Sequence, residues 1–188
     1  YKKGETINAD EITQKVGLPC FVKPNATGSS FGISKVMKKE DLEDAIQLAL
    51  QHDNKVLIEE FIDGTEVSCG IFTHKEIEVF PLTEIVSHND FFDFEAKYKG
   101  LSDEITPARI SREETENVQK ITKDVYQKLG LKGIVRIDYI IMKAKPYLIE
   151  INTIPGLSRE SIIPKQAKQA GYELSELFEL TIENTLNK

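Results

Sequence analysis

The chain has 188 residues, of which 40% are hydrophobic, and it carries a formal net charge of −7 at pH 7 with a pI near 5.1. This length and composition allow a buried core in one large or two small domains. The acidic balance argues against a general nucleic-acid surface, and no apolar run reaches membrane-spanning length and no signal-peptide pattern opens the chain, so we expect a cytosolic protein with neither nucleic acid nor membrane as partner.

The cysteines and histidines form no recognisable metal or disulfide motif. Cys20 and Cys69 lie in apolar, strand-like stretches without CxxC spacing, so we expect both to be reduced core residues. His52, His74 and His88 are scattered, which is typical of surface or turn residues rather than of zinc ligands.

The first part of the chain is predicted to form a small α+β unit. It opens on a polar stretch without a methionine, so we expect the chain to be part of a longer protein. The periodicity predicts, in chain order, a helix at 9–16, strands at 19–23 and 33–37, a helix at 41–51 and a strand at 55–62.

The loop at 24–32 has the composition of a phosphate-covering loop. It places Gly28, Ser29 and Ser30 between two strands, so backbone N–H groups and hydroxyls can face an anion. It is not a Walker A motif, because no lysine follows the second glycine and a strand follows instead of a helix. Lys23, at the end of the preceding strand, can add a point charge to the same phosphates. A polar loop without any ligand is the competing interpretation.

The strand at 55–62 ends in a segment that can serve a nucleotide base. Its last residues are Glu59, Glu60, Phe61 and Ile62, and another strand begins near Glu66 after a turn. An extended segment can offer backbone N–H and C=O groups to an adenine edge while a carboxylate takes ribose hydroxyls. The pattern alone does not show such a role, and carboxylates that only face solvent are the commoner case.

The middle of the chain is predicted to contain a hairpin followed by a long loop. Strands at 65–73 and 76–86 alternate in polarity around a short turn. The segment 87–107 has neither strand nor helix period, yet it holds several aromatic residues and Lys97. Such a loop is typical of a packed functional lid, and Lys97 on it could close over bound phosphate.

Three further helices are predicted. A capping box of Ser111 and Glu114 starts a helix that ends near Gly130. Amphipathic helices at 159–170 and 174–186 follow later and are expected to pack beside the polar hairpin. In the last helix, the apolar residues expected to point inward are Leu174, Leu177, Phe178 and Ile182.

The hairpin between these helices concentrates polar residues. At strand period two, Arg136 and Asp138 face the same way, and after a turn Leu148, Glu150 and Asn152 share a face. If the two strands pair, the four polar side chains can form one patch.

The chemistry of this patch suits a cation and an anion together. Carboxylate and amide oxygens are hard ligands for Mg²⁺, so Asp138, Glu150 and Asn152 are candidate metal ligands. The planar fork of Arg136 matches carboxylate and phosphate groups. A turn at 153–156 ends the strand where a ligand would approach, which favours a site over a solvated sheet face with one ion pair.

Taken in order, these motifs resemble those of the ATP-grasp superfamily and, within it, the D-alanine–D-alanine ligase family. The resemblance covers nearly the whole chain and rests on the segments 22–24, 28–32, 59–62, 92–98, 133–138 and 150–156. It implies an α+β ATP-grasp fold in which two subdomains with antiparallel sheets hold ATP between them. The central subdomain would be 1–64 with the loop 24–32, and the carboxy-terminal one 65–188 with the lid 87–107 and the Mg²⁺ site.

The resemblance also implies an activity and its setting. ATP would phosphorylate the carboxylate of one D-alanine, and the amine of a second D-alanine would attack the acylphosphate to give D-alanyl-D-alanine for peptidoglycan. The implied setting is the bacterial cytoplasm, with two Mg²⁺ ions, Mn²⁺ being possible, and a homodimer as the full-length protein.

Roles for single residues follow from the same resemblance. The residues that would bind ATP are Lys23, Gly28, Ser29, Ser30, Glu59, Glu60, Phe61, Ile62, Glu66 and Lys97. Asp138, Glu150 and Asn152 would hold the two Mg²⁺ ions, with Glu150 bridging. Arg136 and the Gly156 backbone would stabilise the tetrahedral intermediate, and Ser161 with its neighbour Ile162 would lie near the second D-alanine.

The chain departs from the family pattern in two respects. Phe92 and Phe94 stand where the family carries tyrosines, whereas Tyr98 is kept, which in the family accompanies D-alanine rather than D-lactate as second substrate. The family's amino-terminal domain is missing, so this fragment is expected to bind nucleotide weakly and to turn over little by itself. Another ATP-grasp ligase and a non-catalytic nucleotide-binding module are the alternatives.

Overall fold

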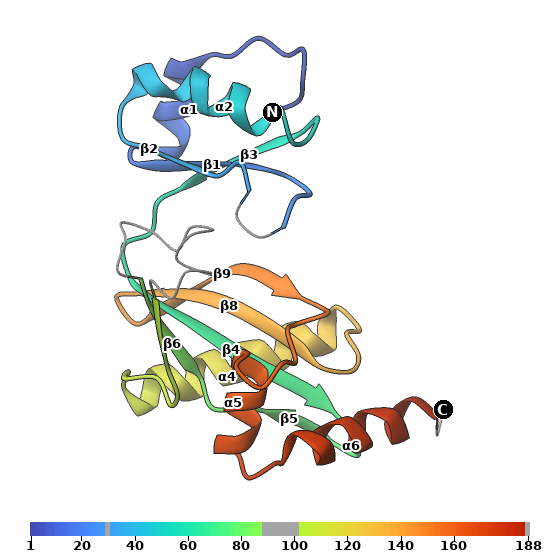
Figure 1. Cartoon of the computed structure of the whole chain (residues 1–188). Helices are drawn as coiled ribbons and strands as arrows, with labels where there is room; N and C mark the ends of the chain where they lie inside the picture. The colour runs from blue at the N-terminus through green and yellow to red at the C-terminus, as the bar shows by residue number, and fades with distance from the viewer. Residues whose placement is uncertain (29–30, 88–101, 187–188) are drawn as a thin grey trace. The chain divides into compact units, whose positions relative to one another are not determined.

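The computed structural model describes residues 1–28, 31–87 and 102–186, which form two compact units (Figure 1). Unit 1 is built from Tyr1–Ile62, and unit 2 from Asp63–Val86 and the described residues from Asp103 onward. Both units combine helices with antiparallel strands, which confirms the predicted α+β class.

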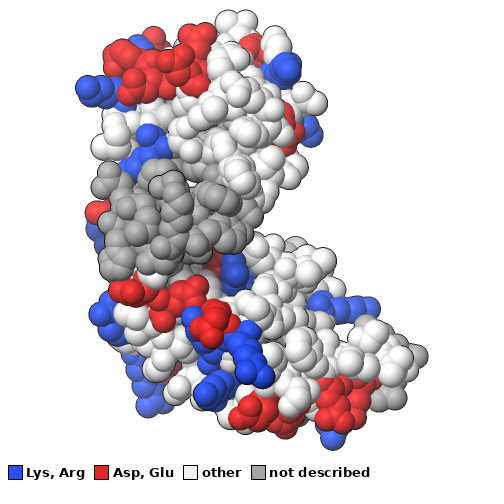
Figure 2. All heavy atoms as spheres, viewed as in Figure 1, with Lys and Arg blue, Asp and Glu red and all other residues white. Residues whose placement is uncertain are grey.

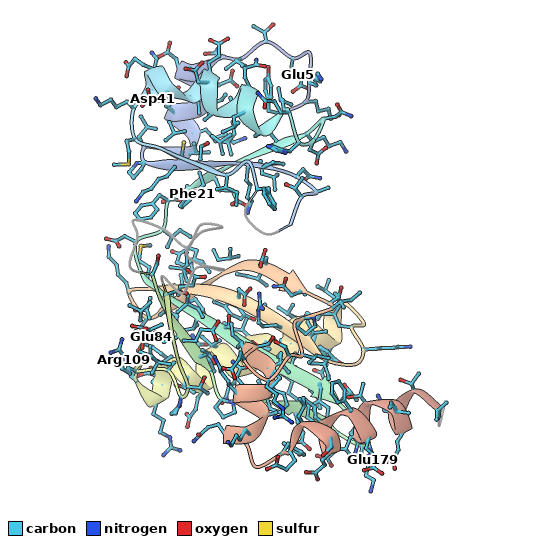
Figure 3. All side chains as sticks on the ribbon, in the orientation of Figure 1. Glu5, Phe21, Asp41, Glu84, Arg109 and Glu179 are labelled. Atoms are coloured by element: carbon cyan, nitrogen blue, oxygen red, sulfur yellow. The ribbon has the colours of Figure 1, made fainter. Side chains whose placement is uncertain are left out.

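Unit 1 is a three-stranded sheet covered by helices on one face. It contains, in chain order, α1 (Ala9–Val16), β1 (Cys20–Pro24), β2 (Ser34–Val36), the 3-10 helix η1 (Lys39–Asp41), α2 (Leu42–Ala49) and β3 (Val56–Glu60). The antiparallel sheet has the order β2-β1-β3. Cys20 and Val22 of β1 are buried against the apolar stripe of α2. Phe21 and Lys23 therefore belong to the opposite face of the sheet, because side chains alternate along a strand (Figure 3).

Unit 2 is built on a larger antiparallel sheet. Its elements are β4 (Thr65–Thr73), β5 (Ile77–Val79), β6 (Thr83–Ser87), β7 (Ser102–Ile105), α4 (Arg112–Lys128), β8 (Val135–Met142), β9 (Lys145–Asn152), α5 (Ile162–Gln169) and α6 (Leu174–Leu186). The strand order is β7-β6-β4-β8-β9, and β5 also pairs with β4. A two-residue turn with positive φ at Lys143 and Ala144 joins β8 to β9, as in a type I′ hairpin.

The central strand β4 separates two apolar layers. Val67, Cys69 and Ile71 pack with residues of α4 and β8, whereas Phe72 packs with residues of α5 and α6. Accordingly, α4 lies on one side of the sheet and α5 and α6 on the other (Figure 1). Both cysteines are free and buried as expected, and burial raises the pKa of the Cys69 thiol to about 12.

The predicted strand at 76–86 is in fact two strands. β5 pairs with Ile71–Thr73 of β4, and β6 pairs with Glu66–Ser68 of the same strand. The interruption includes Pro81, which has no backbone N–H to give to the ladder.

The expectation of a loop throughout 87–107 is also wrong at its carboxyl end. Ser102–Ile105 forms β7, which extends the sheet beyond β6. Its sequence is short and polar, so alternation could not reveal it.

The helices mostly begin and end where expected. Ser111 caps α4, with its side chain accepting from Glu114 N and the Glu114 carboxylate accepting from Ser111 N, so the capping box is confirmed. In α6 the expectation is partly wrong, because Leu177 is buried whereas Phe178 and Ile182 are 39% and 57% exposed. Within the residues that the structure describes, no helix has both the length and the apolar character needed to cross a bilayer.

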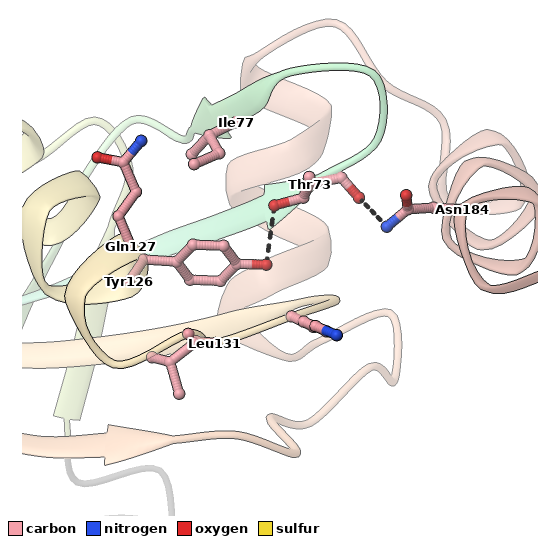
Figure 4. A pocket seen from close by; sticks show the side chains of 8 residues that line it. Thr73, Ile77, Tyr126, Gln127, Leu131 and Asn184 are labelled. Atoms are coloured by element: carbon pink, nitrogen blue, oxygen red, sulfur yellow. Dashed lines mark hydrogen bonds between the residues drawn. The ribbon is translucent and has the colours of Figure 1, made fainter. Parts of the chain in front are cut away.

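A cavity of about 260 Å³ lies where β4 ends (Figure 4). Thr73 donates to the hydroxyl of Tyr126 from α4 at 3.0 Å, and Asn184 from α6 donates to the carbonyl of Thr73 at 2.8 Å. These bonds tie the ends of two helices to the same strand residue.

Charged side chains of both signs lie interspersed on the surface shown in Figure 2. On this view, the part of the chain that the structure describes has no continuous basic patch.

Glu84 and Arg109 form an ion pair in which the glutamate is mostly buried. Arg109 donates from Nε and Nη2 to Glu84, each at 2.9 Å, and the two residues lie side by side in Figure 3. The hydrogen bonds from Arg109 lower the pKa of Glu84 below its ordinary value of 4.5.

We expect the contribution of Glu84 to stability to vanish in acid. Because its pKa is lower in the folded chain, the stabilisation is complete above the ordinary value of 4.5 and is lost as the pH falls through the folded value. Urea unfolding at neutral pH should show Glu84→Gln less stable by up to about 1 kcal/mol, since Arg109 is partly exposed. The difference from the unsubstituted protein should shrink steadily below pH 4.5. Glu116→Gln, in the exposed Arg112–Glu116 pair, is the matched control, and its free energy of unfolding should change little. A stability difference for Glu84→Gln that stays the same at every pH would contradict the assignment.

Candidate active site

The polar residues of the β8–β9 hairpin come together as the sequence predicts. The register places Arg136 opposite Asn152 and Asp138 opposite Glu150. Directly paired residues share a face of the sheet, so these four side chains form one group, which we call the polar cluster. The alternating residues Val135, Ile137, Tyr139 and Ile141 lie in the core on the α4 side.

The Asp138 carboxylate is the centre of the polar cluster. Arg136 donates from Nε to Oδ1 and from Nη2 to Oδ2, each at 2.9 Å, which is a two-pronged contact. Asn152 Nδ2 donates to Oδ2 at 2.9 Å, and Ser68 Oγ of β4 donates to Oδ1 at 2.6 Å. The Asp138 side chain is only 10% exposed, so these donors replace water around a charged group.

Arg136 and Glu150 extend the cluster toward solvent. Arg136 Nη2 lies 3.7 Å from Glu150 Oε1, and Asn152 Nδ2 donates to the same oxygen at 3.0 Å. Burial by itself would lower the pKa of Arg136, but the hydrogen bonds and charge of Asp138 raise it, so the guanidinium stays charged. One guanidinium thus faces two carboxylates, which leaves an excess negative charge that favours a cation.

A β-bulge changes the expected face of the residues before Glu150. The pairing moves from Asp138–Glu150 to Tyr139–Leu148, which leaves Ile149 without an opposite residue. Leu148 therefore shares a face with Tyr139 and not with Glu150, so the expectation for Leu148 is wrong. Simple alternation cannot detect an extra residue of this kind.

The donor set of the polar cluster fits a hard divalent cation. Asp138, Glu150 and Asn152 offer carboxylate and amide oxygens, the ligands that Mg²⁺ accepts. Asn152 points its amide nitrogen at both carboxylates, so its amide would have to turn over before its oxygen could bind a metal. Among the described residues, no group of three or more His, Cys, Asp or Glu side chains is placed to hold a metal.

Glu66 lies on the same face of the sheet as the polar cluster. It pairs with Ile140 of β8, and two residues further along β4 Ser68 pairs with Asp138. The expected ribose carboxylate and the expected metal ligands therefore share one surface of unit 2.

The two residues expected at the substrate end also lie together. A Cβ atom on Gly156 would be 2.8 Å from Ser161 Oγ, so only glycine allows this approach without a shift. Ser161 is the N-cap of α5, and its hydroxyl pairs with Ser158 Oγ at 2.8 Å instead of capping the helix. The first turn of α5 has no acidic residue, so its positive dipole end is not neutralised locally.

Unit 1 has its own face of charged and aromatic residues. Lys23 Nζ lies 2.5 Å from Glu59 Oε2, so two expected ATP residues form an ion pair. Phe21 pairs with Glu59 on one side and with Lys35 on the other. Lys35 Nζ lies 4.0 Å from the centre of the Phe61 ring, which in turn lies 5.9 Å from the Phe21 ring.

Lys35 and Phe21 were not among the expected site residues. The signal was present, because Phe21 and Lys23 alternate with the buried Cys20 and Val22. Only the pairing of β1 with β2 brings Lys35 to that face, and pairing cannot be read from one strand.

Of the remaining expected nucleotide residues, the structure describes Gly28, Glu60, Phe61 and Ile62. Gly28 is exposed, and the start of its loop is held by Ala26 N donating to Asp53 Oδ2 at 2.8 Å. Glu60 is the exposed last residue of β3, and Phe61 N donates to the Pro19 carbonyl at 3.3 Å. Ile62 is half-buried and is the last residue of the first segment of unit 1. Three expected residues lie outside the described part of the chain: Ser29, Ser30 and Lys97.

Comparison with known proteins identifies relatives across the whole chain. The family described as "D-ala D-ala ligase C-terminus" matches residues 1–183. A D-alanine–D-alanine ligase of Flavobacterium johnsoniae is 57% identical over 185 residues, covering 98% of this chain and 57% of that protein. The chain thus spans little more than half the length of the curated relatives it matches.

Solved structures give the same picture. A D-alanine–D-alanine ligase from Bacillus anthracis, solved in complex with ATP, matches with a TM-score of 0.83 at 30% identity, over 100% of this chain and 58% of that one. The VanG D-Ala:D-Ser ligase from Enterococcus faecalis matches with a TM-score of 0.83 at 37% identity, over 92% of this chain and 51% of that one. The predicted ATP-grasp fold is thereby confirmed.

We expect the two acidic members of the polar cluster to differ sharply in their effect on stability. Asp138→Ala leaves the buried Arg136 guanidinium without its main partner and should cost about 3–5 kcal/mol. Glu150→Gln changes a side chain that is 49% exposed and should cost less than about 1 kcal/mol. Chemical denaturation of both variants measures the difference, and equal losses would contradict the central place of Asp138.

Proposed function

This chain belongs to the family of D-alanine–D-alanine ligase carboxy-terminal regions, and we propose that the protein containing it ligates two D-alanines with ATP to make D-alanyl-D-alanine for peptidoglycan. The observation that carries the proposal is the polar cluster, in which Arg136 lies against Asp138 beside Glu150 and Asn152.

Nucleotide binding is assigned to residues of both units. In unit 1, Lys23 would hold phosphates under the loop of Gly28, Ser29 and Ser30, and Lys97 of the lid would close over them. The segment Glu59–Ile62 would meet adenine, with the ring of Phe61 and the charge of Lys35 beside it. Glu66 of unit 2 would take the ribose hydroxyls. The relative from Bacillus anthracis that was solved with ATP supports a nucleotide ligand.

The polar cluster is assigned to the metal and to the reacting groups. Asp138, Glu150 and Asn152 would hold two Mg²⁺ ions, or Mn²⁺. Bound Mg²⁺ would neutralise charge on the transferring phosphoryl group. For Asn152 to take part, its amide has to turn over, so that its nitrogen gives up the hydrogen bonds to Asp138 and Glu150 and its oxygen takes that place.

The chain's own residues then stabilise the two charged stages of the reaction. In the first stage a carboxylate oxygen of one D-alanine attacks the γ-phosphorus of ATP, and ADP leaves. In the second stage the neutral amine of the other D-alanine attacks the acyl carbon, loses a proton, and phosphate leaves. Arg136 uses only Nε and Nη2 on Asp138, so its other N–H groups can face the oxyanion, together with the Gly156 N–H.

The second D-alanine is assigned to the start of α5. Ser161 and Ile162 begin this helix, whose positive end suits a substrate carboxylate. Because the chain spans only 57% of the Flavobacterium johnsoniae ligase, we assign the first D-alanine to the part of the protein outside it and expect the fragment alone to turn over little. We further propose a bacterial, cytoplasmic homodimer for the full-length protein.

One observation favours a second candidate for the acceptor. The VanG relative is named as a D-Ala:D-Ser ligase and is 37% identical to this chain, so the acceptor amino acid is the property in which relatives differ.

We expect the full-length protein to release phosphate from ATP when D-alanine is supplied. A panel of amino acids and D-lactate in the same assay should give the highest rate with D-alanine alone. A higher rate with D-alanine plus D-serine would select the second candidate. A protein that binds ATP but releases no phosphate with any acceptor would be the non-catalytic module.

We expect Glu150→Gln to abolish metal-dependent turnover, because it removes one negative charge and one metal-binding oxygen from the exposed side of the cluster. A loss of about 100-fold or more in kcat, with an unchanged unfolding midpoint, is the expected result. Glu116→Gln on α4 serves as the surface control. Unchanged turnover in Glu150→Gln would remove Glu150 from the mechanism.

A further inference from the structure

Ser68 is a buried hydroxyl that none of the assigned roles uses. It lies on β4 directly opposite Asp138 of β8 and is 3% exposed. Its Oγ donates to Asp138 Oδ1 at 2.6 Å, the shortest of the contacts that surround this carboxylate. The hydroxyl thus fixes the one oxygen of Asp138 that faces β4.

The backbone of the same residue is held from the other direction. Gln166 of α5 is fully buried, and its Nε2 donates to the Ser68 carbonyl at 2.8 Å and to Thr83 Oγ1 at 3.0 Å. A Cβ atom on Gly70 would lie 2.5 Å from Gln166 Oε1, so the amide reaches the strand only because Gly70 has no side chain.

These contacts connect the two ends of the candidate site. Gln166 lies on the helix that Ser161 begins, and α5 is short and rigid. A shift of this helix along the sheet would have to break the hydrogen bonds from Gln166 to the Ser68 carbonyl and to Thr83 Oγ1. Ser68 therefore contacts both Asp138, through its hydroxyl, and α5, through its carbonyl.

We propose that Ser68 is a positioning residue that holds the Asp138 carboxylate in its metal-binding orientation. Through Gln166, Ser68 also fixes the position of α5, the helix assigned to the second D-alanine, relative to Asp138. The proposal rests on the proposed function. Ser68 acts through the two residues that it contacts, Asp138 and Gln166.

The first test measures binding instead of turnover. In the full-length protein, Mg²⁺-dependent binding of a non-hydrolysable ATP analogue is followed by titration calorimetry. Ser68→Ala should raise the Mg²⁺ concentration for half-maximal binding by about 10-fold or more, as residues that orient a metal ligand typically do. Analogue binding without Mg²⁺ should be unchanged.

A second pair of variants separates the hydroxyl from packing. Thr and Val have nearly the same shape, so Ser68→Thr and Ser68→Val crowd the strand equally, but only threonine can donate to Asp138. Ser68→Thr should bind Mg²⁺ better than Ser68→Val by roughly the factor that separates Ser from Ala. Each variant is compared below its own unfolding midpoint, so a change in stability does not count as a change in binding.

A variant of Gln166 tests the link between Ser68 and α5. Gln166→Met keeps the length of the side chain and removes the donor. It should raise the KM for the second D-alanine about 10-fold while the Mg²⁺ dependence of analogue binding stays within about 2-fold.

Each part of the proposal has its own contrary result. Equal Mg²⁺ dependence in the serine and alanine proteins, or equal loss in Ser68→Thr and Ser68→Val, overturns the role of the hydroxyl. An unchanged KM in Gln166→Met overturns the link to α5. If the unsubstituted full-length protein shows no Mg²⁺-dependent analogue binding at all, the proposed function fails first and this proposal falls with it.

Discussion

A charged carboxylate held almost out of water is the constraint on which the site depends. Guanidinium, amide and hydroxyl donors from three strands surround the Asp138 carboxylate. Each donor belongs to a strand whose other residues pack into one core with α4. The apolar layer thus fixes the strands, the strands fix the donors, and Glu150 remains as the exposed carboxylate of the cluster. A buried carboxylate beside an exposed one suits a cation that keeps part of its water.

Much of this arrangement could be predicted from the sequence, because the relevant periods are short and strong. Alternation along 135–142 separates Val135, Ile137 and Tyr139 from Arg136 and Asp138, and one polar face with one apolar face excludes a one-residue slip of the pairing. The capping box at Ser111 is equally local. The family resemblance adds the order of the motifs, which no single period supplies.

The parts that could not be predicted depend on pairing between distant strands. Ser68 reads as an ordinary strand serine until β4 is placed beside β8, and Lys35 reads as a solvent lysine until β2 is placed beside β1. The bulge at Ile149 leaves no local signal. On α6, Phe178 and Ile182 satisfy the helical period but face solvent, because the period gives the direction of a side chain and not the presence of something to cover it.

The close approach of α5 to β4 carries a consequence for how this protein can change over evolutionary time. A Cβ atom at position 70 would lie 2.5 Å from Gln166 Oε1, 2.7 Å from Ile163 Cδ1 and 2.8 Å from Phe80 Cδ2. A lineage that acquires alanine there would need all three neighbours to give way, and a shorter residue at position 166 would lose the bond to the Ser68 carbonyl. These positions should therefore change together, and homologues with another combination would have to anchor this helix by other means.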